Sequence, residues 1–266
     1  TQQIDIVRRE GVELSEVNVV TRKQGTMKLR TSVRNEDMIS SAELTRAACC
    51  NLGESFVTNP SVDVSYSDAA TGAKQIKLLG LSGTYVQMMT ENIPNFRGAA
   101  APYGLGYVPG PWMQSIQVSK GSSSVKNGYE SITGQINVEF KKPQLPEADW
   151  VSANLFASST NRYEANADAT VKLSKRWSTS LLAHYENETK SHDSNDDGFV
   201  DIPRVEQYNV WNRWAYMGDH YVFQAGIKAL HETRNSGQIA HGNTPSHDLY
   251  EIGIKTNRYE AFTKNA

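Results

Sequence analysis

The stretch of sequence that decides the fold is residues 110–143, which read GPWMQSIQVSKGSSSVKNGYESITGQINVEFKKP. Apolar and polar residues alternate over residues 116–119, and they alternate again over residues 136–140. The segment between these two runs is rich in glycine and serine, which favours a turn or loop. The stretch therefore predicts two β-strands with a Gly-rich connection. At Gly121 and Gly134 we expect backbone that turns tightly or packs closely against a neighbour.

Composition argues against a nucleic-acid-binding protein and against a membrane protein built of helices. The chain has 266 residues, enough for one large domain or two ordinary ones. Its formal net charge of -2 offers no general attraction to nucleic acid, so no nucleic-acid partner is expected. No apolar run reaches the length of about 18 residues that a transmembrane helix requires. Membrane β-strands stay possible, because they alternate apolar with polar residues and therefore average out as hydrophilic.

A different pattern begins near Trp150 and continues to the end of the chain. Apolar and polar residues alternate without a break over residues 163–173, and shorter runs of the same kind recur. Such a strand fits lipid on one face and a wet lumen on the other. The runs are residues 151–155, 163–173, 177–185, 207–216, 221–229 and 250–254. They predict about six strands of a membrane β-barrel, although Asn212 falls on the apolar side of the fourth strand.

The connections between these strands support the same interpretation. Residues 174–176 and 217–220 are short connections, whereas residues 189–206 and 232–248 are long ones. Short periplasmic turns that alternate with long extracellular loops are typical of outer-membrane barrels. The sequence therefore predicts a sheet with one periplasmic and one extracellular end.

The first half of the chain predicts a mixed α and β domain. Ser41 is expected to cap one amphipathic helix over residues 41–53, because apolar residues recur there at helical spacing. Residues 95–111 show no periodicity and predict a long loop. Further strands are expected over residues 25–34, 61–66, 75–80 and 86–89.

Residues 110–143 resemble the end of the plug domain of TonB-dependent outer-membrane receptors. The matching segments are QSIQV at 114–118, KGSSSV at 120–125, NGY at 127–129 and ITGQINV at 132–138. LGESFVTNPSVDV at 52–64 is similar to a second plug passage. The sequence departs from the family pattern at four places: Leu79 replaces arginine, Glu91-Asn92 replaces Asp-Gly, Ser122 replaces proline and Gln135 replaces glycine.

This resemblance implies the fold class and the domains. It implies an α+β plug domain over residues 25–145, followed by antiparallel transmembrane β-barrel strands over residues 146–266. Residues 1–24 would be an N-terminal extended segment. A receptor barrel of this class has 22 strands. We therefore expect an incomplete barrel of about six strands and a chain that is a fragment of a 22-stranded receptor.

Residues 13–22, ELSEVNVVTR, are rich in β-branched residues and precede any domain core. On physical grounds such a segment can add to the sheet edge of another protein, or it can form an ordinary edge strand. It resembles the TonB box, which implies the periplasmic C-terminal domain of TonB as a partner. The residues expected to contact TonB are Glu16, Val17, Asn18, Val19, Val20 and Thr21.

Two predicted loops supply candidates for ligand contact. In a plug, residues 82–85 and 95–111 would form an apex that faces the extracellular vestibule. Aromatic and cationic side chains suit ligand binding, but they also fill gaps against a barrel wall. The candidates are Tyr85, Phe96, Arg97, Tyr103 and Tyr107.

One loop has the spacing of a calcium site. Oxygen ligands stand at loop positions 1, 3, 5, 7 and 9, with Gly198 at position 6 for the sharp turn. Arg204 occupies position 12, where an EF-hand loop has glutamate. The ligands would be Asp193, Asn195, Asp197, the carbonyl of Phe199, and Asp201. The sequence thus predicts a structural Ca²⁺ in an extracellular loop, and the alternative is an acidic, solvated loop.

The remaining motifs carry no recognisable chemistry. Cys49 and Cys50 are adjacent, and we expect both to pack as small apolar residues. His231, His241 and His247 match no compact zinc spacing. No nucleophile elbow, HExxH motif or phosphate-binding loop is present, so we do not expect an enzyme.

The resemblance implies an active-transport receptor in the Gram-negative outer membrane. The plug would fill the barrel lumen, the long loops would be extracellular, and lipid would surround the strands. The ligand would be a small metal-containing molecule such as a siderophore, haem or cobalamin chelate, or a metal ion, taken up with energy transduced by TonB. The alternatives are a calcium-stabilised extracellular binding or adhesion protein and a passive porin.

Overall fold

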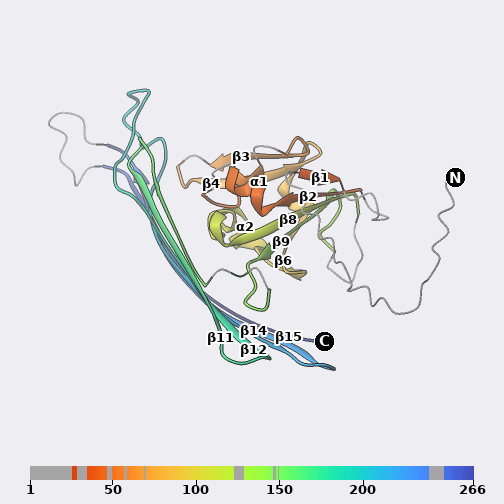
Figure 1. Cartoon of the computed structure of the whole chain (residues 1–266). Coiled ribbons are helices and arrows are strands. Elements are labelled where there is room, and N and C mark those ends of the chain that lie inside the picture. Colours follow the sequence, from red (N-terminus) through yellow and green to blue (C-terminus); the bar gives the residue numbers. More distant parts are fainter. Residues whose placement is uncertain are drawn as a thin grey trace, which may run out of the picture.

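The computed structural model describes residues 26–28, 35–46, 50–56, 59–68, 70–122, 129–145, 148, 150–239 and 249–266. It has two parts: an N-terminal α+β body up to residue 145, and a C-terminal sheet from residue 151 onward. In Figure 1 the sheet is strongly curved, and the body lies against its concave face. Within the described ranges, no helix is both long and apolar enough to cross a membrane.

The N-terminal body is built around one sheet with the strand order β1-β2-β8-β9-β6-β7. The predicted strands of residues 110–143 are β8 (Met113–Lys120) and β9 (Gly134–Phe140), which pair antiparallel at the centre. Beside β9 lies the parallel strand β6 (Val86–Thr90), followed by β7 (Ile93–Pro94). On the other side lie β2 (Asn35–Ser40) and the edge strand β1 (Thr26–Lys28).

The predicted glycine requirements are met at both ends of the β8–β9 connection. Gly121 has φ +90°, a left-handed conformation that L-residues with a side chain rarely adopt. At Gly134 a Cβ atom would lie 2.2 Å from the carbonyl oxygen of Ser119. The neighbouring strand is therefore close enough to β9 only because residue 134 has no side chain.

Shorter elements complete the body. A second sheet contains β3 (Val62–Asp68), β4 (Ala73–Leu78) and β5 (Leu81–Ser82). The predicted loop 95–111 contains short helical turns, η3 (Gly98–Ala100) and α2 (Ala101–Gly104), and η4 (Gly110–Trp112) begins at its end. The helical elements are α1 (Ser41–Arg46), η1 (Glu54–Phe56), η2 (Gly83–Tyr85), η3 (Gly98–Ala100), α2 (Ala101–Gly104) and η4 (Gly110–Trp112).

The predicted helix over residues 41–53 is wrong at its C-terminal end. Helix α1 ends at Arg46, and residues 50–53 are not helical. Their backbone groups bond elsewhere: Gly110 N donates to Cys50 O at 2.8 Å, and Leu52 N donates to Val108 O at 3.0 Å. Apolar spacing suggested a helix there, but these long-range backbone bonds satisfy the same groups.

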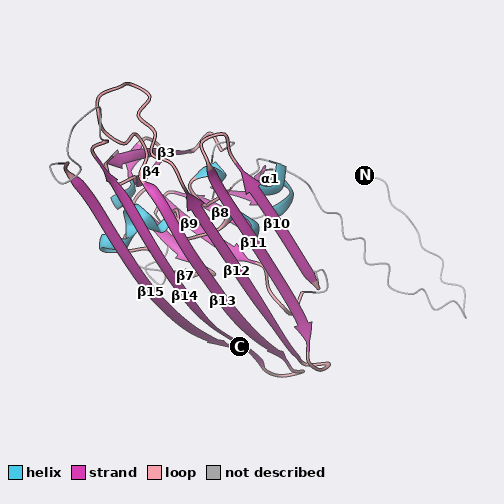
Figure 2. Cartoon of the chain, turned by 90° about the vertical axis from the view of Figure 1, so that its left-hand side faces the viewer, coloured by secondary structure: helices cyan, strands magenta, loops and turns pink. Residues whose placement is uncertain are grey.

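The C-terminal sheet is an antiparallel meander in which each strand pairs with its sequence neighbours, as Figure 2 shows. Its strands are β10 (Val151–Ala157), β11 (Arg162–Lys172), β12 (Trp177–Glu188), β13 (Arg204–Met217), β14 (Val222–Gly237) and β15 (Glu251–Asn265). Strands β14 and β15 run farther than predicted, because Ser236, expected in a loop, pairs with Ile252, and residues 255–265 pair with β14 beyond the predicted run 250–254. Among the described residues, β10 and β15 each pair with one strand only, so the sheet is open.

Alternation along the strands gives the sheet two faces. On β12, Ser178, Leu182 and Glu186 are buried beneath the body, whereas Trp177 and Leu181 on the other face are exposed. The polar Asn212 lies on the outer face, where its Nδ2 donates to Ser180 O at 3.1 Å. That bond explains how an amide is tolerated at a position where the pattern calls for an apolar residue.

One hydrophobic core joins the two parts. Ile116, Val138 and Trp112 form part of the centre of the body, and each is fully buried. Leu182 and Trp211, from the curved sheet, belong to the same cluster. The body is therefore packed onto the sheet through a shared core, and polar contacts surround it.

Candidate functional site

The candidate site is the interface between the N-terminal body and the inner face of the curved sheet. Polar contacts cross this interface at several heights along the strands. Because any movement of the body relative to the sheet must break them, we describe the contacts from the long-loop end to the short-turn end.

Near the long-loop end, Arg162 at the start of β11 binds the body. Its Nη1 lies 2.8 Å from Glu54 Oε1, and the same guanidinium lies 2.6 Å from Glu164 and 2.9 Å from Glu186. Glu54 is also held locally, because Asn51 Nδ2 donates to it at 3.0 Å. Burial acts to raise the pKa of Glu54, but the Arg162 guanidinium outweighs it and the net pKa is lowered. Glu54 therefore stays ionised at neutral pH.

At mid-height the sheet binds backbone of the body. The carbonyl oxygen of Tyr107 accepts from Asn209 Nδ2 at 3.0 Å and from Lys228 Nζ at 3.1 Å. One residue earlier, Gly106 O accepts from Gln207 Nε2 at 3.2 Å. Asn209 and Lys228 are both buried, so the Tyr107 carbonyl supplies a hydrogen-bond partner to each, and Lys228 Nζ also lies 3.8 Å from Glu260 Oε1.

Toward the short-turn end, Arg213 of β13 binds Glu91. Arg213 Nη2 lies 2.6 Å from Glu91 Oε1, and both side chains are only 2% exposed. Lys264 of β15 adds a second cation, with its Nζ 3.6 Å from Glu91 Oε2. Glu91 and Asn92 form the turn between β6 and β7 with φ values of +50° and +64°. A hairpin turn of this kind requires two positive φ values, which glutamate adopts rarely.

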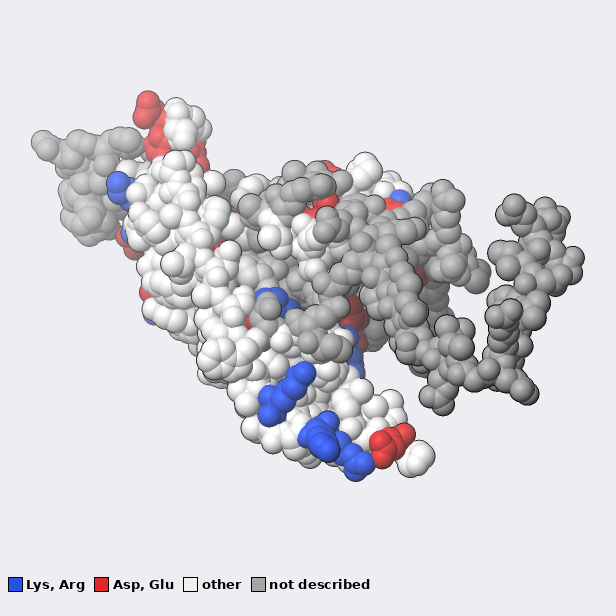
Figure 3. All heavy atoms as spheres, in the orientation of Figure 1, with Lys and Arg blue, Asp and Glu red and all other residues white. Residues whose placement is uncertain are grey.

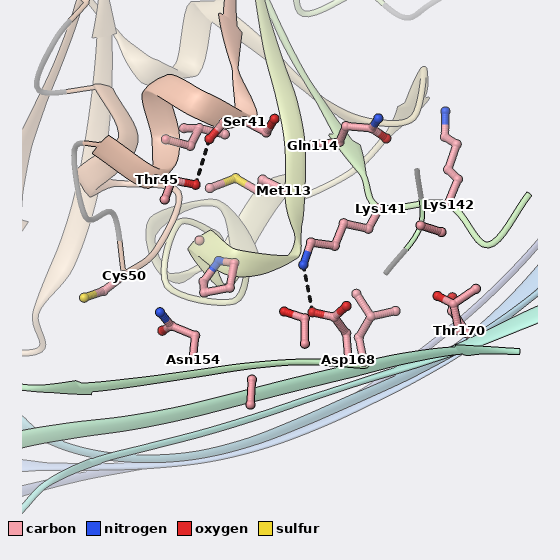
Figure 4. Close-up of a pocket in the computed structure, with 18 of the residues that line it drawn as sticks. Ser41, Thr45, Cys50, Met113, Gln114, Lys141, Lys142, Asn154, Asp168 and Thr170 are labelled. Carbon is pink, nitrogen blue, oxygen red and sulfur yellow. Dashed lines mark hydrogen bonds and ion pairs between the residues drawn. The ribbon is translucent and has the colours of Figure 1, made fainter. Parts of the chain in front are cut away.

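Between α1, β8 and the strands β10–β12 the interface is hollow. The cavity has a volume of about 720 Å³, and Figure 4 shows its lining. Lys141 of the body reaches across it to Asp168 of β11, with Nζ 2.8 Å from Oδ1. Cys50 lies on the body side of the same cavity. Burial raises the pKa of its thiol well above its usual range, and Glu164 and Glu54 add to that effect.

The five residues predicted to contact ligand do not form one cluster. Tyr85 and Arg97 are exposed, and Arg97 binds Glu130, with Nη2 2.9 Å from Oε1. Phe96 and Tyr107 are buried, at 4% and 2% exposed. Tyr103 is half-buried beneath the guanidinium of Arg234, 5.4 Å from the ring centre. Their role in ligand binding stays a prediction.

The predicted calcium loop lies at the long-loop end of the sheet, where Figure 3 shows acidic side chains gathered. Asp193 accepts from the backbone N–H groups of Asp197 and Gly198 at 3.2 and 2.9 Å. Asp201 Oδ2 accepts from Ser194 N at 2.7 Å. Asn195 Nδ2 donates to Asp197 Oδ2 at 3.0 Å, and the loop also contains Phe199. No group of three or more His, Cys, Asp or Glu side chains among the described residues is arranged to hold a metal ion.

Other predicted residues fall elsewhere. The segment expected to contact TonB, residues 16–21, lies outside the described residues, and so do Cys49, His241 and His247. His231 lies on β14, where its Nδ1 is 2.7 Å from Asn257 Oδ1.

Sequence reasoning did not identify the interface residues. Arg213 and Lys228 were visible only as polar members of alternating strands, Arg162 only as the residue before the run 163–173, and Glu91 only as a departure from the family pattern. A charged residue on the lumen face of a barrel strand is common. The signal that could have marked them is a basic residue in a strand interior, but it does not name a partner.

Comparisons with known proteins agree with this architecture. Residues 28–135 match the family model of the TonB-dependent Receptor Plug Domain. No curated protein matches the chain. Solved structures that are similar include the ferric-catecholate import receptor Fiu of E. coli K12, with a TM-score of 0.60 at 17% identity over 76% of this chain and 28% of that one.

Two further structures give the same result. P. aeruginosa FpvA, bound to a heterologous pyoverdine and iron, has a TM-score of 0.66 at 14% identity, over 89% of this chain and 32% of that one. The copper transporter OprC has a TM-score of 0.64 at 14% identity, over 89% of this chain and 35% of that one. The chain therefore spans about a third of the length of the receptors that it matches.

A small α+β domain that packs onto the polar inner face of an antiparallel meander defines the plug-and-barrel class of fold. The family-model match shows that residues 28–135 are a plug domain of the TonB-dependent receptor type, and the fold of the described chain is similar to that of the solved receptors. We refer below to the N-terminal body as the plug and to the curved sheet as the wall.

Proposed function

We propose that the chain is part of an outer-membrane receptor that takes up a scarce, metal-containing ligand with energy transduced by TonB. The observation that carries this proposal is a plug domain held on the polar face of a sheet whose opposite face is apolar and exposed. Leu155 and Ile227, on that outer face, are 81% and 65% exposed. Such a face is stable in lipid, and the polar face suits a lumen.

The named relatives favour the ligand class. Fiu is described as a ferric-catecholate importer, FpvA was solved with an iron-bound pyoverdine, and OprC is described as a copper transporter. Their identities of 14 to 17% show a shared fold alone. A metal, as copper or as an iron chelate, is common to these three descriptions.

Fractionation and uptake test this function together. We expect the full-length protein to fractionate with outer membranes, and cells that produce it to accumulate one of a panel of ⁵⁵Fe chelates. Accumulation should stop when the proton-motive force is collapsed, while binding at the cell surface continues. Uptake that persists without energy would indicate a passive porin, and a protein that leaves the membrane fraction on washing would indicate an extracellular binding protein.

We also propose that residues 193–201 bind Ca²⁺. In support, the carboxylates of Asp193 and Asp197 already hold a tight loop through backbone N–H groups. Hard oxygen ligands at alternate positions suit this ion. Ca²⁺ would neutralise the repulsion between these carboxylates and order the loop.

Removal of calcium tests this loop. Chelation should raise hydrogen exchange at residues 193–201, and Asp193→Asn should give the same result with calcium present. Asp219→Asn, in a turn at the other end of the sheet, is the matched control and should change nothing. Exchange in the loop that is the same with and without chelator would contradict the calcium proposal.

A further inference from the structure

The outer face of the wall, which Figure 2 shows, can be read in rows across paired strands. Trp177 pairs with Tyr216 near the short turns, and Tyr185 pairs with Tyr208 near the long loops. Trp177 and Tyr185 lie eight residues apart on β12, which is about 26 Å along a strand. At a tilt of about 40° this length covers about 20 Å of membrane thickness, close to the apolar band of about 25 Å on such barrels.

The outer face changes from apolar to polar at Tyr185. The rows between Trp177 and Tyr185 are mostly apolar, with Leu181 and Ile227 among their members. The row of Tyr185 and the next row toward the long loops carry polar groups, and their side chains are exposed or partly exposed. We call these two rows the rim patch: Tyr185, Tyr208, His231, Asn257, Asn187, Glu206, Thr233 and Lys255. From the spacing, the rim patch lies at the height of the lipid headgroups.

Three rings lie side by side across the rim patch. The ring centres of Tyr185 and Tyr208 are 4.9 Å apart, and those of Tyr208 and His231 are 6.5 Å apart. Asn257 Oδ1, 2.7 Å from His231 Nδ1, fixes the third ring. The face of an aromatic ring is partly negative and attracts the polarised C–H groups that one side of a sugar ring presents. The row therefore suits a saccharide stacked on it.

Hydrogen-bonding groups adjoin these rings. Glu206 Oε1 accepts from the Tyr208 hydroxyl at 2.8 Å and lies 3.5 Å from the Tyr185 hydroxyl. Asn187 Nδ2 donates to the Tyr185 hydroxyl at 2.8 Å. A carboxylate has about four lone-pair positions, and an amide has two donors and one acceptor. The same groups that orient the rings can therefore also bind the hydroxyls of a ligand.

The aromatic row at the short-turn end is built differently. The ring centre of Trp177 is 5.1 Å from that of Tyr216 and 6.4 Å from that of Phe223. Phe223 stands on β14 where the rim patch has His231, so this row presents fewer polar groups. Rings alone are enough to anchor a barrel at the membrane interface. The carboxylate and amides of the rim patch go beyond that requirement.

The charges around the rim patch suit a phosphorylated headgroup. Lys255 stands in the row of Glu206, and Arg204 lies two residues before Glu206 on the same face of β13. Both cations are exposed. Two cations and one carboxylate leave one net positive charge, and hydrogen bonds from a cation to phosphate are among the strong ones.

We propose that the rim patch binds the phosphorylated saccharide headgroup of a glycolipid in the outer leaflet of the membrane. The sugar lies on the three rings, and the acyl chains lie along the apolar rows below them. The inference rests on the proposed function, because that function places the sheet in the outer membrane with its long loops outside.

Native mass spectrometry of the full-length receptor in detergent tests the rim patch. The probes are hexa-acylated lipid A, a phosphorylated glucosamine disaccharide, and phosphatidylglycerol, which has acyl chains and phosphate but no sugar. We expect lipid A to bind more tightly than phosphatidylglycerol. Tyr208→Leu and His231→Leu should each weaken lipid A binding about fivefold, because a stacking ring is lost. Phosphatidylglycerol binding should change little.

Matched controls lie on the same two strands at the short-turn end. Tyr216→Leu on β13 and Phe223→Leu on β14 also remove a ring from an aromatic row, and they should leave lipid A binding unchanged. Each rim variant is measured by itself, so a folding defect in one leaves the other as the test. Equal losses at both ends would overturn the proposal, since they would reduce the rim patch to an interfacial anchor.

Two other results would also overturn the proposal: phosphatidylglycerol that binds as tightly as lipid A, and lipid A that binds none of these receptors. Lipid binding is read without uptake. A receptor that binds lipid A at the rim patch but accumulates no chelate would contradict the proposed uptake and leave this inference intact. Energised uptake together with lipid A binding that the rim variants do not change would overturn this inference alone.

Discussion

Deletion of residues 16–21 should reduce energised uptake to the level of de-energised cells while surface binding of the ligand is unchanged. The segment is β-branched, precedes the plug in sequence and resembles the TonB box. A strand added to the edge of a partner's sheet binds through its backbone N–H and C=O groups. In the proposed function, loss of that contact stops force from the inner membrane from reaching the plug, while the ligand-binding surfaces are intact.

Single substitutions separate backbone pairing from other effects of the deletion. Val19→Pro removes one N–H donor and restricts φ, so it should abolish uptake nearly as well as the deletion. Val19→Ala keeps the donor and should retain most uptake, which makes it the matched control. Loss of both binding and uptake in the Pro variant would contradict a role limited to energy transfer, and full uptake in it would contradict strand addition.

Arg213→Met should weaken plug docking more than any other single change at the interface. Arg213 and Glu91 are both buried, so removal of the guanidinium leaves the Glu91 carboxylate with one partly exposed cation, Lys264, at 3.6 Å. Breaking a buried pair in this way typically costs about 3 to 5 kcal/mol. The measurement is hydrogen exchange at amides of β6 and β9, because local opening there reports on the stability of the plug core.

Two further variants test whether the unpaired buried charge causes the weaker docking. Arg213→Met combined with Glu91→Gln removes both charges and should recover most of the lost protection. The exposed pair Arg176–Asp219, whose side chains are 53% and 77% exposed, is the control. Arg176→Gln should cost about 0 to 1 kcal/mol, as exposed pairs do. If Arg213→Met lowers the protection of the β6 and β9 amides no more than Arg176→Gln does, the buried pair does not hold the plug.

The role of Glu91 also gives a reason for the unusual turn between β6 and β7. The φ of +50° at this residue would suit glycine better. Glu91→Gly should therefore relieve backbone strain and still weaken docking, because Arg213 and Lys264 lose their carboxylate. The tight turn places that carboxylate between the two cations of the wall.

Much of the architecture could be predicted because it depends on local periodicity. Alternation of period two identified β8 and β9 and the strands β10–β15, since successive side chains of a strand point to opposite faces. The α1 prediction extended past Arg46, and the strands β14 and β15 were predicted too short, for one reason. At these ends, backbone hydrogen bonds to other segments of the chain decide the structure. The periodicity of the side chains does not reveal those bonds.

The residues of the site could be predicted from the sequence less well than the fold. The sequence by itself determined the two-part design, the face of each strand that is polar, and the glycines at 121 and 134. Only the tertiary structure decided that Arg162 meets Glu54, that Arg213 meets Glu91 and that Lys141 meets Asp168 across a cavity. These partners are 108, 122 and 27 residues apart. An ion pair depends on distance in space, and the order of residues along the chain does not specify that distance.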